Sequence, residues 1–164
     1  MNVALPTFLA LLLLAAAQAP AAPAPGSAHE RFFTGRTEGA GTVHVILSGR
    51  HAVRHRSVGR IERGGTLVMD ELLEEEGKPA RRRTWRLVRA AGNRIAGSIS
   101  DARGPVSGTI AGPVLHLRYR LAEGPSVEQS IALRPGGRAA TNRMTFRRFG
   151  IVVARVESTI RRVD

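Results

Sequence analysis

Hydrophobic and polar side chains alternate along much of the chain. The alternation is strictest at residues 115–121 (LHLRYRL) and 152–161 (VVARVESTIR), and a two-residue period places one face of a strand in a core and the other in water. Glycine, proline and polar clusters recur about every ten residues from Phe32 onward. No long window shows the i, i+3, i+4, i+7 spacing of an amphipathic helix. The pattern predicts an all-β domain.

Eight further segments have the composition of strands and are separated by turn signals such as Gly64-Gly65 and Pro135-Gly136-Gly137. These segments are residues 42–48, 51–61, 66–74, 81–89, 93–100, 106–111, 126–133 and 141–149. About ten short strands with tight links predict an antiparallel meander. The glycines at positions 97, 104, 108 and 112 are compatible with bends at barrel corners and equally with ordinary turns.

An open sheet of this size would leave one apolar face bare and two strand edges unpaired. The sequence pattern predicts no helix to cover them. Because closure removes the edges, we expect a single antiparallel meander β-barrel of about 8–10 strands. A two-sheet β-sandwich is the structural alternative.

The N-terminal region has the composition of a signal peptide. Residues 5–17 (LPTFLALLLLAAA) form an apolar run that is shorter than the ~20 residues of a transmembrane helix, and small residues in A-x-A spacing follow it. We predict a signal peptide at 1–21 with cleavage between 17 and 22, a Pro/Ala-rich linker at 22–30 and the barrel domain at 31–164. The protein is then periplasmic or secreted; tethering to the membrane by an uncleaved N-terminal segment is the alternative.

Charge and cysteine content narrow the chemistry. The formal net charge is +12, and residues 1–28 contain no Asp, Glu, Lys or Arg, so the whole charge lies on residues 29–164. Lys78 is the only lysine among the 25 basic residues. There is no cysteine, which excludes disulfides, thiol nucleophiles and cysteine metal sites.

No motif of a catalytic or cofactor site is found. The sequence lacks G-x-S-x-G, H-E-x-x-H and phosphate-loop patterns, so we assign no catalytic residue and no cofactor. His51 and His55 lie on a predicted strand, where four residues span ~13 Å, too far for a shared zinc ion. The other histidines, His29, His44 and His116, are expected at the surface or in turns. Few aromatic residues and the predicted export argue against a nucleic-acid partner.

Residues 67–121 carry a linked set of acidic, arginine, aromatic and glycine positions. The set is Asp70-Glu71, Gly77, Arg83, Trp85, Gly97, Asp101, Gly104, Gly108, Gly112 and Tyr119. Together with Phe33, Gly35, Gly39 and Gly41 upstream and Arg143 with Phe149-Gly150 downstream, it resembles the bacterial family called domain of unknown function 3833. The resemblance implies an exported or envelope-associated β-rich protein with a lipocalin-like barrel.

The predicted hairpin at 66–89 places an acid and a base inside the barrel. A register with Met69 opposite Trp85 puts Glu71 opposite Arg83. Because an unpaired buried charge is costly, the two side chains are expected to pair. The pair either fixes strand register in a closed polar interior or marks the floor of a ligand cavity. The run at 74–76 (EEE) lies beside a turn and is expected to be solvated.

Three functional hypotheses follow from these patterns. We expect a non-catalytic, monomeric binder of a small apolar or amphipathic ligand such as a lipid. Its expected ligand-binding residues are Met69, Glu71, Leu73, Arg83, Trp85, Leu117, Tyr119 and Arg143. The first alternative is an envelope protein that docks on anionic lipid or lipopolysaccharide through its outer arginines. These arginines are Arg118, Arg120, Arg155 and Arg161. The second alternative is an enzyme that uses Glu71 or Asp101 as an acid or base.

Overall fold

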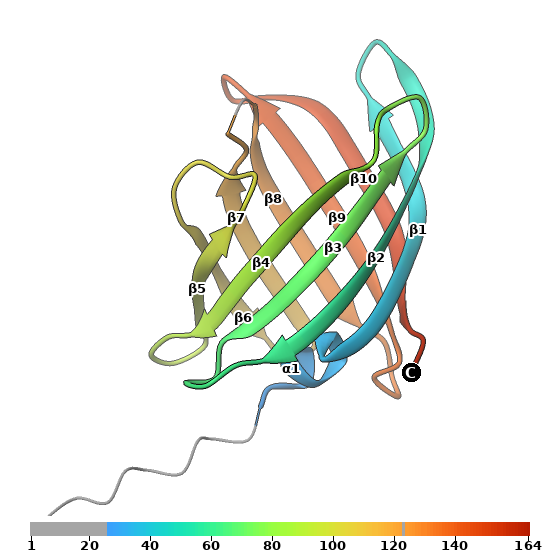
Figure 1. Cartoon of the computed structure of the whole chain (residues 1–164). Helices are drawn as coiled ribbons and strands as arrows, with labels where there is room; N and C mark the ends of the chain where they lie inside the picture. The colour runs from blue at the N-terminus through green and yellow to red at the C-terminus, as the bar shows by residue number, and fades with distance from the viewer. Residues whose placement is uncertain (1–25, 123) are drawn as a thin grey trace, which may run out of the picture.

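The computed structural model describes residues 26–122 and 124–164, which fold into a closed barrel with a short helix at one end (Figure 1). The elements in chain order are α1 (Ala28–Phe33), β1 (Gly35–Val45), β2 (Gly49–Ile61), β3 (Leu67–Glu75), β4 (Arg81–Arg89), β5 (Arg94–Ile99), β6 (Val106–Ala111), β7 (Val114–Arg120), β8 (Ser126–Leu133), β9 (Ala139–Arg148) and β10 (Ile151–Arg162). Each strand pairs antiparallel with the next, and β1 pairs with β10. This closure confirms the predicted all-β meander barrel and excludes the sandwich. The predicted signal peptide at 1–21 lies outside the described residues.

β1 is the strand that the alternation pattern predicts least well. It begins seven residues before the predicted segment 42–48, and it carries glycine at Gly39 and Gly41, where an alternating side chain would otherwise face inward. A Cβ at Gly39 would lie only 1.9 Å from Nε2 of His55, so a larger residue here would displace the His55 ring. β1 hydrogen-bonds to β2 on one side and β10 on the other. Backbone pairing therefore makes residues 35–41 part of the strand, although they present no apolar face.

The four recurrent glycines divide between the two predicted roles. Gly97 and Gly108 lie within strands, where a Cβ would come 2.0 Å and 2.2 Å from a carbonyl oxygen of the facing strand. Gly104 and Gly112 lie in turns. Close backbone approach therefore explains the first two glycines, and chain reversal explains the second two.

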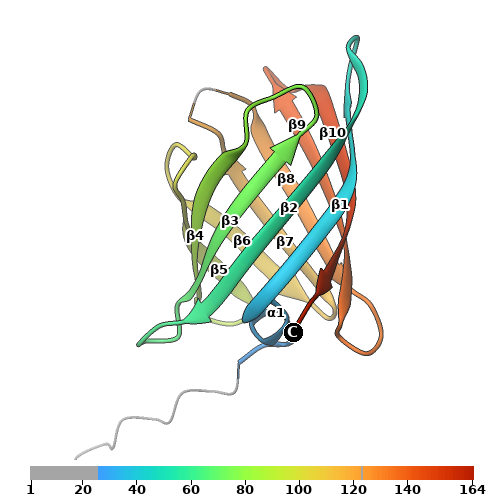
Figure 2. The same ribbon diagram turned by 45° about the vertical axis from the view of Figure 1, so that its right-hand side comes forward.

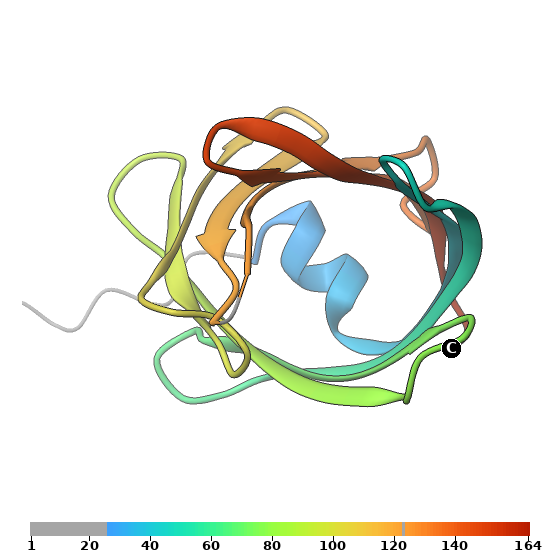
Figure 3. The same ribbon diagram turned by 90° about the horizontal axis from the view of Figure 1, so that it is seen from above.

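α1 closes one end of the barrel, and Figure 3 shows it within the outline of the strands. Ser27 and Glu30 form a capping box at its start. His29, Phe32 and Phe33 are buried, and Nε2 of His29 lies 3.0 Å from the carbonyl oxygen of Pro113. The sequence pattern predicts neither this helix nor its burial. Residues 28–30 belong to the predicted linker, and the expected surface position of His29 is wrong because α1 turns its ring into the barrel. Among the described residues no helix is long and apolar enough to cross a bilayer.

Candidate functional site

A cavity of about 300 Å³ lies inside the barrel. It extends from Phe33 of α1 at one end to Lys78 in the β3–β4 turn at the other. We call this second end, where the β1–β2, β3–β4, β5–β6, β7–β8 and β9–β10 turns lie, the mouth. Apolar side chains line much of the cavity because every second residue of a barrel strand points inward. They include Val43, Val53, Leu73, Leu117, Met144 and Val156.

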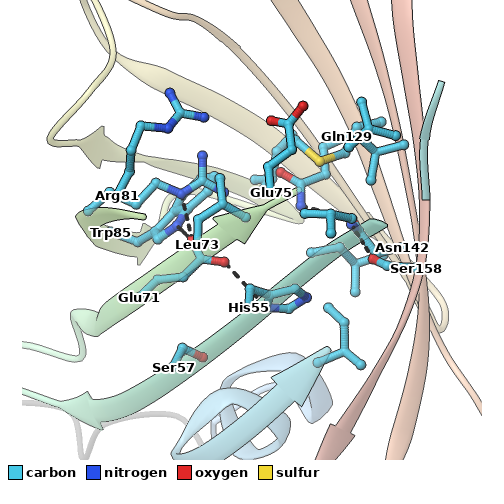
Figure 4. A pocket seen from close by; sticks show the side chains of 18 of the residues that line it. His55, Ser57, Glu71, Leu73, Glu75, Arg81, Trp85, Gln129, Asn142 and Ser158 are labelled. Carbon is cyan, nitrogen blue, oxygen red and sulfur yellow. Dashed lines mark hydrogen bonds and ion pairs between the residues drawn. The ribbon is translucent and has the colours of Figure 1, made fainter. Parts of the chain in front are cut away.

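The predicted acid–base pair lies in the wall of this cavity. Met69 faces Trp85, and Glu71 faces Arg83, across β3 and β4, so the register inferred from the alternation is confirmed. Nε of Arg83 donates to Oε2 of Glu71 at 2.6 Å. The indole N–H of Trp85 donates to the same oxygen at 2.9 Å (Figure 4). The Arg83 and Glu71 side chains are only 8% and 10% exposed. Asp101 approaches Nη1 of Arg83 at 3.7 Å.

The surroundings of this pair keep both of its members charged. Burial alone raises the pKa of Glu71, but the charge of Arg83, the neighbouring His55 and the hydrogen bonds from Arg83 and Trp85 outweigh burial, so the pKa lies below its ordinary value. Burial lowers the pKa of Arg83, and the attraction of Glu71 outweighs that effect and raises it. An ionised Glu71 has no proton to donate at neutral pH. The carboxylate is therefore better suited to hold Arg83 than to act as a general acid.

His55 on β2 adds a third buried group to the pair. Its Nδ1 lies 3.4 Å from Oε1 of Glu71. Burial lowers the pKa of His55 by more than the attraction of Glu71 raises it, and Arg83 lowers it further, so the imidazole is neutral near pH 7. Within the described part of the chain its Nε2 has no hydrogen-bond partner. We call His55, Glu71 and Arg83 the buried triad.

A second histidine–glutamate pair lies nearer the mouth on the same two strands. Nε2 of His51 is 3.5 Å from Oε1 of Glu75, and Nζ of Lys78 is 2.7 Å from the same oxygen. The Glu75 side chain is 11% exposed, so the expectation that the run at 74–76 is solvated is wrong at this position. β3 continues to Glu75, and its alternation turns that side chain inward. His51 and His55 thus each face a glutamate and not one another.

A ladder of polar side chains crosses the wall formed by β7, β8, β9 and β10. The Tyr119 hydroxyl donates to Oε1 of Gln129 at 3.3 Å, and Nε2 of Gln129 donates to Oδ1 of Asn142 at 2.9 Å. Nδ2 of Asn142 then donates to Oγ of Ser158 at 3.1 Å (Figure 4). Burial raises the pKa of Tyr119, so the hydroxyl keeps its proton. We call these four residues the polar ladder. Gln129, Asn142 and Ser158 were not predicted, although a polar residue at an inward position of an alternating strand is a signal of such a site.

The predicted ligand-binding residues separate into three groups. Those that line the cavity are Met69, Glu71, Leu73, Arg83, Trp85 and Leu117. Tyr119 is buried beside the cavity, with its ring edge-on to Trp85 at 5.4 Å between centroids. Arg143 is outside: its side chain is 71% exposed and lies 3.4 Å from Glu157. The prediction for Arg143 is wrong because its neighbours, Asn142 and Met144, take the inward positions of β9.

The four predicted surface arginines face outward but do not form one patch. Arg118 and Arg120 lie on β7, whereas Arg155 and Arg161 lie on β10, and β8 and β9 separate these strands. Six residues along β10 correspond to ~20 Å between Arg155 and Arg161. Arg118 also lies 3.8 Å from Glu128. The structure therefore offers no single basic face made of these residues.

A closed antiparallel meander around an internal cavity is the architecture of a lipocalin-like barrel. The chain belongs to the family described as protein of unknown function (DUF3833), whose model matches residues 13–162. Among solved structures, the S-type phycobiliprotein lyase CPES from Guillardia theta is similar, with a TM-score of 0.64 and 10% sequence identity, over 83% of this chain and 91% of that chain. No curated protein matches the chain. At this identity the likeness shows the fold, so the expectation that the chain is not an enzyme stays a prediction.

We expect acid to destabilise the barrel in two stages. The pKa of His55 is lowered from 6.5 in the folded protein, so below about pH 6.5 the unfolded chain binds more protons and stability falls. The pKa of Glu71 is lowered from 4.5, which adds a second loss below about pH 4.5. Thermal unfolding between about pH 3 and 8 should show a smaller first stage in His55→Gln than in the wild type, while the buried His29, whose pKa is also lowered, keeps its own share. The exposed His116 is the control, and His116→Gln should keep both stages. A first stage of wild-type size in His55→Gln would contradict the assignment.

Proposed function

We propose that the protein holds a small amphipathic molecule inside its barrel. The observation that carries the proposal is the cavity of about 300 Å³, in which apolar walls surround a few buried polar groups. Small-molecule sites commonly combine a mostly apolar surface with a few well-placed polar groups. Barrels of comparable size also hold single small ligands. The apolar and polar parts of the cavity each indicate something about the ligand.

The apolar part of the cavity stays open because the sequence places small or medium-sized side chains where larger ones would close it. Val43, Val53, Ala154 and Val156 line this part of the cavity. Protein interiors are normally packed with few voids larger than a water molecule, and an unfilled apolar cavity lowers stability. Retention of this space supports an occupant with an apolar body.

The polar part favours an uncharged group on the ligand. Arg83 already balances the charge of Glu71, so a charged ligand group would find no unpaired opposite charge in the buried triad. When the Nδ1–H of neutral His55 points to Glu71, Nε2 is an acceptor. The side-chain amides of Gln129 and Asn142 each have a second N–H beyond the ladder bond. A hydroxyl can donate or accept and therefore suits either kind of group, so we infer an apolar ligand with an uncharged hydroxyl or similar group.

The test uses Trp85, which lines the cavity and is the only tryptophan of the sequence. N-phenyl-1-naphthylamine, a neutral apolar fluorophore, is titrated into the full chain while Trp85 is excited. We expect saturable energy transfer to the fluorophore. Ala154→Phe fills the cavity near the mouth and should weaken apparent affinity by about tenfold or more. The matched control is Ala52→Phe on β2, where the exposed side chain points away from the cavity.

The outcome is read together with thermal stability. Ala154→Phe should unfold no earlier than the wild type, because the added ring occupies empty space. If the wild type shows no saturable transfer, or if both phenylalanine variants bind the fluorophore equally well, the proposal is wrong.

A further inference from the structure

Two hairpin tips at the mouth expose apolar side chains to solvent. Leu47 in the β1–β2 turn is 102% exposed and Phe149 in the β9–β10 turn is 96% exposed. Ile151 and Ile46, beside them, are 69% and 38% exposed. Figure 2 shows the β1–β2 hairpin rising beyond the other strands at this end. We call these four residues the tip patch. In the rest of the described chain the exposed large hydrophobic residues are 37–54% exposed and lie on the barrel sides or at its opposite end.

The backbone at the two most exposed residues has a conformation that favours other residue types. Leu47 and Phe149 have φ of 72° and 51° and are the only described residues other than glycine with positive φ. Glycine, asparagine or aspartate adopt this conformation at lower cost. A bulky apolar side chain in this conformation, without buried contacts, adds nothing to folding. Exposed apolar side chains that gather in one place commonly mark an interaction site.

Charge at the tips indicates the chemistry of that partner. The two tip segments, residues 45–50 and 147–152, contain three arginines and no carboxylate, and the chain as a whole carries +12. Arg147 lies 3.9 Å from Glu128, a long separation for an ion pair. Apolar side chains bordered by arginine are the pattern of segments that insert at the interface of a membrane with anionic lipids.

We propose that the mouth docks on an anionic bilayer, with Leu47 and Phe149 inserted between the lipids and the neighbouring arginines at the headgroups. The tips lie at the mouth, where the exposed Lys78 and Arg81 line the cavity. Val45, two residues before Leu47, and Ala154, three residues after Ile151, line the cavity. Docking therefore brings the cavity against the lipid. An amphipathic ligand then passes between bilayer and barrel without crossing water, a consequence that rests on the proposed function.

The test is flotation of the full chain with lipid vesicles. Vesicles contain phosphatidylcholine alone or with about 30% phosphatidylglycerol. We expect the wild type to bind the anionic vesicles more strongly, and this preference to weaken at high salt. Leu47→Asn with Phe149→Asn should reduce binding by about tenfold or more. Asparagine suits positive φ, so this variant should fold as stably as the wild type.

The matched control moves the same chemical change to the barrel side. Val58 and Val88 are 54% and 37% exposed and belong to β2 and β4; Val58→Asn with Val88→Asn should bind vesicles as the wild type does. All variants carry identical residues 1–25, so their differences report the barrel. Wild-type binding by the tip variant, or an equal loss in the side variant, overturns the docking proposal. Equal binding to neutral and anionic vesicles overturns it as well.

Energy transfer from Trp85 separates this proposal from the proposed function. Leu47 and Phe149 do not line the cavity, so the tip variant should bind N-phenyl-1-naphthylamine with unchanged affinity. Ala154→Phe should lose the fluorophore and still float with anionic vesicles. If the wild type binds the fluorophore but does not bind vesicles, only the docking proposal is wrong. If the wild type binds anionic vesicles but does not bind the fluorophore, only the proposed function is wrong.

Discussion

Replacing Arg83 with methionine is expected to lower the free energy of unfolding by about 3–5 kcal/mol. Methionine keeps much of the apolar stem but leaves the carboxylate of Glu71 buried without its cation. The remaining neighbours are the Trp85 indole, 2.9 Å from one oxygen, and neutral His55, 3.4 Å from the other. Burial then dominates, and the pKa of Glu71 rises above its ordinary value. Chemical denaturation at several pH values measures the effect. In the variant, the contribution of Glu71 is lost as the pH rises, which is the opposite of the wild type.

Arg60 provides the matched control for this substitution. Its Nη1 lies 2.8 Å from Asp70, nearly as close as the buried pair, but the two side chains are 53% and 55% exposed. Exposed ion pairs contribute little because water solvates both charges. Arg60→Met should therefore leave the denaturation midpoint almost unchanged. If the two methionine variants lose equal stability, burial does not increase the contribution of the Glu71–Arg83 pair to the free energy of unfolding.

The double variant Glu71→Leu with Arg83→Met separates the two roles that the sequence leaves open for the pair. Removing both charges is often neutral or stabilising, since no buried charge is left unpaired. If stability recovers while the barrel loses N-phenyl-1-naphthylamine, the pair belongs to a ligand site. If the double variant is as stable as the wild type and binds the fluorophore equally well, the pair neither fixes strand register nor belongs to a ligand site. If the double variant is as unstable as Arg83→Met, the pair fixes the register of β3 on β4.

The barrel was predictable because its signals are local. Alternation gives the strands, and the short turn between β3 and β4 limits the register enough to place Glu71 opposite Arg83. α1 was not predictable from periodicity, since six residues are fewer than two helical turns. The capping box of Ser27 and Glu30 was a readable signal. The burial of α1, however, depends on the open end of a barrel whose strands follow later in the chain.

The site was only partly predictable because most of its contacts cross several strands. His55 approaches Glu71 diagonally: the register of β2 on β3 places Ser57, not His55, opposite Glu71. Such a contact depends on side-chain length and barrel curvature as well as on alternation. The polar ladder requires three successive registers, from β7 to β10, to bring Gln129 and Asn142 into line. The outward position of Arg143 required only the phase of one strand. Asn142 and Arg143 are both polar, so hydropathy at these two positions does not show which of them faces inward.

Truncating Phe33 to alanine is expected to lower the free energy of unfolding by about 3–5 kcal/mol. The ring is 5% exposed, packs edge-on against Phe32 at 4.9 Å between centroids and forms the α1 end of the cavity. The backbone beneath it is equally tight, since a Cβ at Gly59 would lie 1.8 Å from the carbonyl oxygen of Phe33. Neighbouring strands are hydrogen-bonded to one another and cannot collapse into the vacated space. The cost should therefore lie near the upper end for a phenylalanine truncation, measured by denaturant unfolding.

Phe149→Ala removes the same atoms from a ring that is 96% exposed, so it should leave the unfolding midpoint nearly unchanged. The difference between the two truncations measures how firmly α1 is packed into the barrel end. Equal and small losses would mean that α1 does not seal the cavity, and that strand pairing alone stabilises the barrel. A large loss for Phe33 alone means that the cavity has a fixed floor, so that a ligand enters and leaves only through the mouth.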